Sequence, residues 1–202
     1  MGNDGNKSIV SLRVAYESEL ERFKADLQEA FRVSAEREFG HTLDKPIPSD
    51  EDVEESFRAD GAIVYQILVD EKIAGGAIVL IDEVTQCNKL SLFFILNGKH
   101  DRGVGYKAWK AIEERHPKTK IWETFTPYFE KRNIHFYVNK CGFKIVGFYN
   151  KHHPDPDHRH DGDAGEKDEM FKFEKQMEWA ESAEPAAVSS NRRAGHEVMR
   201  FR

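Results

Sequence analysis

Three apolar segments follow one another in the first half of the chain, and together they require a sheet. Residues 62–69 and 72–81 are separated by only two acidic residues, and residues 89–96 follow after a short polar stretch. Dense aliphatic and aromatic content of this kind is typical of strands that are covered on both faces. The first two segments therefore predict a hairpin, with Gly75-Gly76 as a candidate bulge, and the third predicts a central strand.

The rest of the chain alternates between helical and strand patterns. The further predicted elements are, in chain order, a strand at 8–16, a long amphipathic helix at 17–40, a short acidic helix ending at 58, a helix from the turn after residue 96 to Pro117, a strand at 119–125, a helix opening at Thr126-Pro127 and closing at Gly142, and strands at 143–150 and 169–177. The order β-α-α-β-β-β-α-β-α-β-β predicts an α/β fold with a mixed sheet that is covered by helices.

The turn after the third apolar segment has the features of an anion site. The stretch "LNGKHDRGVGYKAWKAI" (96–112) passes from a strand through two glycines, Gly103 and Gly105, into a helix. Glycines leave the backbone N–H groups of such a turn accessible at the positive end of the helix dipole, and nearby basic residues add charge. An ordinary capped turn is the alternative, because the stretch lacks the third glycine of a dinucleotide motif and the Gly-Lys-Ser/Thr of a P-loop.

The charge and cysteine content exclude several classes of protein. The 202 residues contain 36 acidic and 30 basic side chains, and the net charge of −6 is not that of a nucleic-acid-binding or membrane-surface protein. The two cysteines, Cys87 and Cys141, lie far apart, which suits a reducing compartment. We see no apolar run of the roughly 18 to 20 residues that a membrane span needs. We therefore expect a cytoplasmic protein.

One domain accounts for most of the chain. Residues 1–178 are predicted to form it, and residues 179–202 have the composition of a flexible C-terminal tail. Within the domain, residues 151–168 form a polar loop rich in His and Asp. Imidazoles and carboxylates can bind a transition metal, but the spacing here is not diagnostic, and we expect a solvated connection without a required metal.

Two separated motifs resemble those of the GNAT-type N-acetyltransferases, over roughly residues 8–177. "HDRGVG" (100–105) is similar to the family pattern of Gln or Arg, two residues, Gly, one residue, and Gly or Ala, between a strand and a helix. "KRNIHFYVNKCGFKIVGF" (131–148) is similar to the second signature, an Asn, an aromatic-Tyr pair and a Gly-Phe that leads into a strand. The resemblance implies a GNAT-like mixed sheet, splayed between its fourth and fifth strands and flanked by about four helices, with the pantetheine arm of acetyl-CoA in the splay.

The resemblance also assigns residues to acetyl-CoA, the implied cosubstrate. The backbone N–H groups of residues 102–106 would hold the pyrophosphate, the strand end at 94–96 would line the pantetheine with its main chain near Ile95, and Asn133 would contact the same arm. The implied cofactor residues are Phe94, Ile95, Leu96, His100, Arg102, Gly103, Val104, Gly105, Tyr106 and Asn133. His100 stands where the family has Gln or Arg, which weakens the diphosphate contact and leaves a solvated side chain as the alternative.

Two residues are expected to carry the chemistry. By the resemblance, Tyr137 would reach the CoA sulfur as general acid, and it lies four residues after Asn133 on the same helix face. The alternative for Tyr137 is a packed aromatic side chain. Glu123 in "WETF" is the best placed base, with Asp82 and Glu83 as weaker choices. The alternative for Glu123 is a carboxylate that faces solvent or only attracts a cationic substrate.

The implied activity is transfer of an acetyl group from acetyl-CoA to a primary amine by direct attack in a ternary complex, because the sequence shows no activated nucleophile. The acceptor would be a small-molecule or peptide amine, and the acidic character of the chain favours a cationic one. The protein would be a monomer or a homodimer. A non-catalytic acyl-CoA-binding or regulatory module on the same fold is the alternative.

Overall fold

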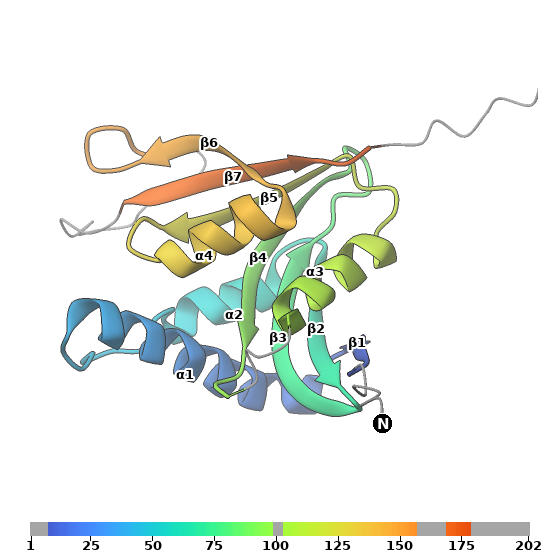
Figure 1. Cartoon of the computed structure of the whole chain (residues 1–202), viewed down its shortest axis with the longest axis horizontal. Helices are drawn as coiled ribbons and strands as arrows, with labels where there is room; N and C mark the ends of the chain where they lie inside the picture. Colours follow the sequence, from blue (N-terminus) through green and yellow to red (C-terminus); the bar gives the residue numbers. More distant parts are fainter. Residues whose placement is uncertain (1–7, 99–102, 157–168, 179–202) are drawn as a thin grey trace, which may run out of the picture.

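A mixed sheet with helices on both faces organises the chain (Figure 1). The computed structural model describes residues 8–98, 103–156 and 169–178. Its elements are β1 (Val10–Val14), η1 (Glu17–Glu19), α1 (Leu20–Phe39), α2 (Asp50–Arg58), β2 (Ala62–Val69), β3 (Lys72–Leu80), β4 (Cys87–Ile95), α3 (Val104–Arg115), β5 (Ile121–Pro127), α4 (Lys131–His135), η3 (Phe136–Cys141), β6 (Lys144–Tyr149) and β7 (Met170–Gln176). The predicted order of strands and helices is confirmed.

The sheet divides at its only parallel pair of neighbouring strands within the described residues. Seven strands lie in the order β1-β2-β3-β4-β5-β7-β6, and β4 and β5 are the parallel pair. Their ladder begins at Cys87 and Ile121 and ends at the pair Leu90–Thr124. Beyond that pair β4 and β5 diverge, as Figure 1 shows. The predicted splay between the fourth and fifth strands is confirmed.

Successive side chains of β4 pack against helices on opposite faces of the sheet. Phe94 packs in a cluster with side chains of α1 and α2, whereas its neighbour Ile95 packs in a cluster with Val104 and Ala108 of α3. Successive residues of a strand point to opposite faces. The helices α1 and α2 therefore cover one face of this half of the sheet, and α3 covers the other.

The bulge was predicted at the wrong position. The β2–β3 register shifts between Ile67 and Leu68, which places the extra residue at Ala74 rather than at Gly75-Gly76. Both glycines serve close packing instead, because a Cβ at Gly75 would lie 2.2 Å from the Phe94 carbonyl oxygen and one at Gly76 equally close to the Phe23 ring.

The helix predicted from Thr126-Pro127 begins only at Lys131. Thr126 and Pro127 pair with Phe171 and Met170 and so extend β5, because cross-strand pairing outweighs the helix-starting preference of proline. The predicted end at Gly142 is confirmed by its left-handed φ of 81°. Among the described residues, no helix combines the length and the apolar character that crossing a membrane requires.

A half-buried histidine at the end of α3 is held in its neutral form. His116 Nε2 lies 3.1 Å from the Tyr65 hydroxyl, and its ring contacts Trp122 edge to face. Burial, and secondly the charge of Arg115, lowers the pKa of His116 below its ordinary value of 6.5. The unfolded chain therefore binds a proton at this side chain at a higher pH than the folded chain does.

This difference predicts a pH-dependent stability. The free energy of unfolding should decrease as the pH falls below 6.5, because the unfolded imidazole takes up its proton first. Urea unfolding at a series of pH values measures the slope. A His116→Gln variant should have a flatter slope in this interval, and a slope equal to that of the wild type would contradict the assignment.

Candidate functional site

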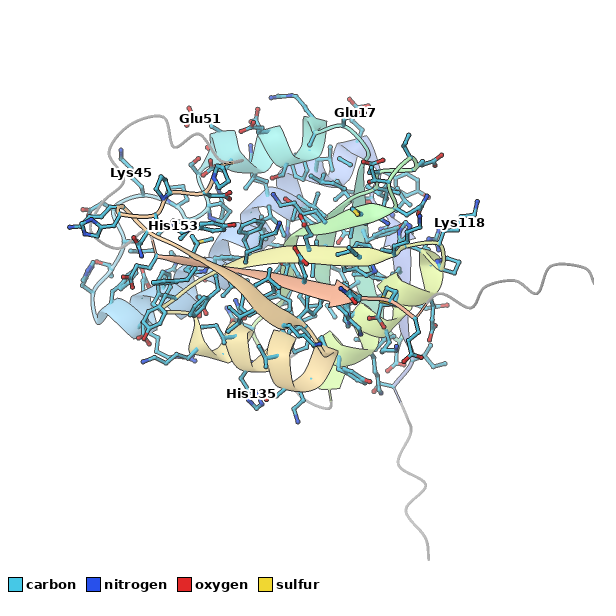
Figure 2. All side chains as sticks on the ribbon, turned by 90° about the horizontal axis from the view of Figure 1, so that it is seen from above. Glu17, Lys45, Glu51, Lys118, His135 and His153 are labelled. Atoms are coloured by element: carbon cyan, nitrogen blue, oxygen red, sulfur yellow. The ribbon has the colours of Figure 1, made fainter. Side chains whose placement is uncertain are left out.

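The divergence of β4 and β5 opens a cleft of about 440 Å³. Four parts of the fold form its walls: the second half of α1, the end of β4, the first turn of α3, and α4 with η3. On α4, the exposed His135 points away from the sheet (Figure 2), so the opposite side of this helical segment faces the sheet and the cleft. The cleft therefore lies between segments that are far apart in the sequence.

Six of the ten residues assigned to the cofactor line this cleft, namely Phe94, Ile95, Gly103, Gly105, Tyr106 and Asn133. Leu96 packs against the α1–α2 core cluster instead. The side chain of Val104 is buried beside Ile95 and Ala108, although the prediction concerned its backbone N–H in the first turn of α3. His100 and Arg102 lie outside the described residues.

The start of α3 leaves backbone donors open toward the cleft. Gly103 precedes the helix with φ 72° and ψ 27°, a left-handed conformation that favours glycine, and it has no side chain with which to cap the helix. The first N–H groups of α3 and the positive end of its dipole are thus available to an anion. This geometry suits the predicted anion site.

Folding does not account for the second glycine of this turn. Gly105 lies within α3, and a Cβ there would be 3.4 Å from the Phe136 ring and 3.8 Å from Ile95, which are ordinary contacts. Alanine would favour the helix by about 0.8–1.0 kcal/mol relative to glycine. A glycine at this position therefore points to close approach of a ligand to the backbone.

The end of β4 presents unpaired backbone groups to the same cleft. The N–H of Leu96 donates to the Ala74 carbonyl at 2.8 Å, next to the partners Ile95 and Gly75. In an antiparallel ladder this pattern makes Ile95–Gly75 a non-hydrogen-bonded pair, so the N–H and C=O of Ile95 point away from β3. Because the β4–β5 ladder ends at Leu90, these groups of Ile95 face the cleft.

Tyr137 lies at the closed end of the cleft, where β4 and β5 separate. It is 6% exposed, belongs to the π-helical turn η3, and lies near the Thr124 hydroxyl, which acts to lower its pKa. Thr124 Oγ1 in turn donates to the Leu90 carbonyl at 2.9 Å, within the last pair of the ladder. Burial raises the pKa of Tyr137 well above its ordinary value, and the contact with Thr124 only partly opposes it. The phenol therefore remains protonated.

Glu123 lies on the other face of β5 from Thr124 and Tyr137. Thr124 points toward Tyr137, so the neighbouring Glu123 points to the opposite face, where its Oε1 lies 2.8 Å from Lys172 Nζ. Among the described residues that line the cleft, neither Glu123 nor its alternatives Asp82 and Glu83 occurs. The role of Glu123 as base stays a prediction that its position does not support.

One carboxylate that lines the cleft, that of Glu130, was not predicted from the sequence. Glu130 immediately precedes α4, is 7% exposed, and accepts a hydrogen bond from Ser34 of α1 at 3.0 Å. Burial raises the pKa of its carboxyl above the ordinary value. Its position three residues before Asn133, nearly one helical turn, is the signal that could have pointed to it.

Basic side chains also reach the cleft. Arg37, Arg132 and Lys140 line the cleft from α1, α4 and η3.

Most of the His/Asp-rich loop and all of the predicted tail lie outside the described residues. Within the described ranges, no group of three or more His, Cys, Asp or Glu side chains is arranged to hold a metal ion.

Known proteins share both the sequence pattern and the fold. The model of the acetyltransferase (GNAT) family matches residues 20–143. The uncharacterized protein YrkN of Bacillus subtilis (strain 168) is 51% identical over 177 residues, which cover 85% of this chain and 96% of that protein.

Two solved structures illustrate the similarity of fold. A Bacillus subtilis acetyltransferase in complex with CoA has a TM-score of 0.59 at 18% identity, covering 84% of this chain and 99% of that chain. A GNAT family acetyltransferase from Elizabethkingia anophelis with acetyl-CoA bound has a TM-score of 0.57 at 13% identity, covering 85% and 99%.

The hydrogen bond of Thr124 generates a prediction about the closed end of the cleft. Thr124→Val keeps the shape of the side chain but leaves the Leu90 carbonyl without this hydrogen bond and removes a polar neighbour of Tyr137. The free energy of unfolding should fall by about 1–3 kcal/mol, measured by urea unfolding. Thr124→Ser keeps the hydroxyl and should lose less, and a valine variant as stable as the wild type would contradict the assignment.

Proposed function

Because the chain belongs to the acetyltransferase (GNAT) family, we propose that it is an N-acetyltransferase that moves the acetyl group of acetyl-CoA to a primary amine. The observation that carries the proposal is the cleft at the β4–β5 divergence, which is lined both by the open first turn of α3 and by Tyr137. The solved relatives with CoA or acetyl-CoA bound support the choice of cosubstrate.

The residues of the cleft suit the parts of acetyl-CoA. The N–H groups at the start of α3 would hold the pyrophosphate, and the outward-facing N–H and C=O of Ile95 would bond the pantetheine amides. Asn133 would contact the same arm from α4. When bound there, acetyl-CoA supplies the thioester that is to be cleaved, and the chain supplies alignment of the two reactants.

Tyr137 would stabilise the departing sulfur as a hydrogen-bond donor. Its hydroxyl hydrogen can rotate toward the cleft, since Tyr137 lies at the closed end. Full proton transfer from a phenol with a raised pKa to a thiolate is uphill, because thiols are more acidic than phenols, with a pKa of about 8.5 for a cysteine side chain against about 10 for tyrosine. The gain therefore comes from a donor that remains protonated and is already in place when charge develops on sulfur.

The state of the thiols favours direct attack by the amine. Burial raises the pKa of Cys141 to about 12, so this thiol stays protonated and is a poor nucleophile. Cys87 is exposed at the start of β4 and is not among the lining residues. An acetyl-enzyme on cysteine thus has no suitable residue in the described cleft, which supports a ternary complex.

We also place the protein in the cytoplasm. Cys87 and Cys141 are both free thiols, and Cys87 is exposed. An exposed free thiol is vulnerable to oxidation in an oxidising compartment, so its presence suits a reducing one.

A non-catalytic acyl-CoA-binding module is the second candidate. The observation that favours it is the ion pair between Glu123 and Lys172, which holds the expected base on the wrong face of β5. Such a module would bind acetyl-CoA in the same cleft but would not transfer its acetyl group to an amine.

Substitution of Gly105 tests where the cosubstrate binds. Gly105→Glu places bulk and negative charge against the pyrophosphate and should abolish the binding of acetyl-CoA, measured by titration calorimetry. Gly105→Ala is the matched comparison, because its Cβ fits the fold at 3.4 Å from Phe136. It should be at least as stable as the wild type, and its methyl group should weaken acetyl-CoA binding far less than the glutamate does. Equal affinity of the glutamate variant and the wild type would place acetyl-CoA elsewhere.

Substitution of Tyr137 tests the activity. Tyr137→Phe should lower the turnover by about 10²-fold or more while leaving acetyl-CoA affinity unchanged, because only the hydroxyl is removed. Release of the free thiol of CoA in the presence of a primary amine reports the turnover, and calorimetry reports the affinity. An unchanged turnover would remove Tyr137 from the mechanism, and a wild type that binds acetyl-CoA but acetylates no amine would indicate the non-catalytic module.

A further inference from the structure

Glu130 is the only acidic residue among the described residues that line the cleft. It directly precedes α4, yet its carboxylate does not cap that helix. The side chain instead extends across to α1, where Oε2 accepts the hydrogen bond of the Ser34 hydroxyl at 3.0 Å. Two segments that are 96 residues apart in the chain thus meet at this carboxylate.

A comparison with Glu113 shows how unusual the surroundings of Glu130 are. Glu113 is also buried, but its carboxylate lies 2.5 Å from Lys110 Nζ and forms a second ion pair with Lys175. Within the described ranges no such ion pair is found for Glu130, and a neutral hydroxyl is its hydrogen-bond partner. A buried carboxyl without an ion-pair partner is costly to stability, which points to a role other than folding.

Burial leaves the carboxylate of Glu130 more basic than an exposed one. Burial is the main cause of the raised pKa, and the negative charge of Glu38 adds to it. The hydrogen bond from Ser34 and the charge of Arg132 act in the opposite direction. A carboxylate whose pKa lies closer to neutrality is better matched to accepting a proton at physiological pH.

We propose that Glu130 is the catalytic base of this cleft and takes the proton of the attacking amine, and that Ser34 is a positioning residue that orients its carboxylate. The inference rests on the proposed N-acetyltransferase activity and replaces Glu123 in the role of base. Glu130 and Tyr137 line the same cleft, and the charge of Glu130 contributes to the raised pKa of Tyr137. The carboxylate thus stands on the wall that carries Tyr137, the proposed donor to sulfur.

The proton and electron pairs balance in this step. The nitrogen of a neutral amine forms a bond to the thioester carbonyl carbon, and the carbon–sulfur bond breaks with its electron pair staying on sulfur. One N–H proton passes to the carboxylate of Glu130, directly or through one water. The thiolate leaves with a hydrogen bond from Tyr137 and is protonated by solvent, while Glu130 returns its proton to solvent.

Glu130→Gln is the main test, because glutamine keeps the size of the side chain and can still accept the Ser34 hydrogen bond. Each variant is first titrated with acetyl-CoA by calorimetry. Acetyl transfer is then followed by thiol release with spermidine, kanamycin and a peptide with a free α-amine as probes. Glu130→Gln should bind acetyl-CoA as tightly as the wild type, but its kcat should fall by about 10²–10⁴-fold and the acidic limb of its pH profile should disappear.

Three further variants separate a base from a structural residue. Ser34→Ala removes a hydrogen bond that lowers the pKa of Glu130, so it should shift the acidic limb of the pH profile to higher pH. Glu130→Asp keeps a carboxylate and should retain the acidic limb at a lower kcat. Glu114→Gln, in an exposed position on α3, is the matched control and should leave kcat unchanged.

The possible failures are distinguishable. If the wild type binds acetyl-CoA but acetylates none of the probes, the proposed activity fails and the role of Glu130 with it. If the wild type is active and Glu130→Gln keeps its kcat and its acidic limb, only the role of Glu130 is overturned. A rise in KM at constant kcat would also overturn it, since Glu130 would then bind the acceptor without taking its proton. Loss of kcat in Glu123→Gln together with an active Glu130→Gln would return the role of base to Glu123.

Discussion

The end of the parallel β4–β5 ladder at Leu90–Thr124 is the constraint on which the rest of the structure depends. If the ladder continued, the backbone groups of Ile95 would be paired and the space between the two strands would be closed. Because it stops, the N–H and C=O of Ile95 face the cleft, and no described strand pairs with them on that side. Thr124 secures this point by its bond to the Leu90 carbonyl, and Tyr137 joins it there. The end of the parallel ladder and the closed end of the cleft, where Tyr137 lies, thus coincide.

Aromatic packing holds the two halves of the sheet together on the closed side of this point. Trp109 of α3 lies edge to face against Trp122 of β5, with ring centroids 5.3 Å apart, and also packs against Phe143 at 5.1 Å. Large rings buried in this way contribute strongly to stability and resist displacement. The closed side is therefore rigid and apolar, whereas the open side carries the charged and polar groups of the cleft. Such a division suits a site that must align two reactants without moving the sheet.

The two buried glutamates, Glu113 and Glu130, differ in their surroundings: those of Glu113 suit a structural role, and those of Glu130 suit the proposed catalytic one. The chain surrounds Glu113 with lysines, as expected for a carboxylate that is retained for structure. Around Glu130 it provides one hydroxyl and an opening to the cleft. At similar burial, the carboxylate of Glu113 is thus neutralised by lysines, whereas that of Glu130 keeps an oxygen that can accept a proton. Natural proteins accept this kind of local cost at sites of chemistry.

The local patterns of the sequence determined the order of the elements, the central place of residues 89–96 and the glycine turn before α3, because hydrophobic periodicity and glycine conformation act over a few neighbouring residues. The resemblance of residues 131–148 to the second family signature likewise led to Asn133 and Tyr137, which the cleft does contain. Only the tertiary structure decided the bulge at Ala74, the strand continuing through Pro127 and the outward face of Glu123, since each depends on pairing with another strand. The contact of Glu130 with Ser34 joins residues 96 positions apart, and burial at that distance has no local signal. It arises because the tertiary fold brings the second half of α1 close to the residue that precedes α4, at the cleft.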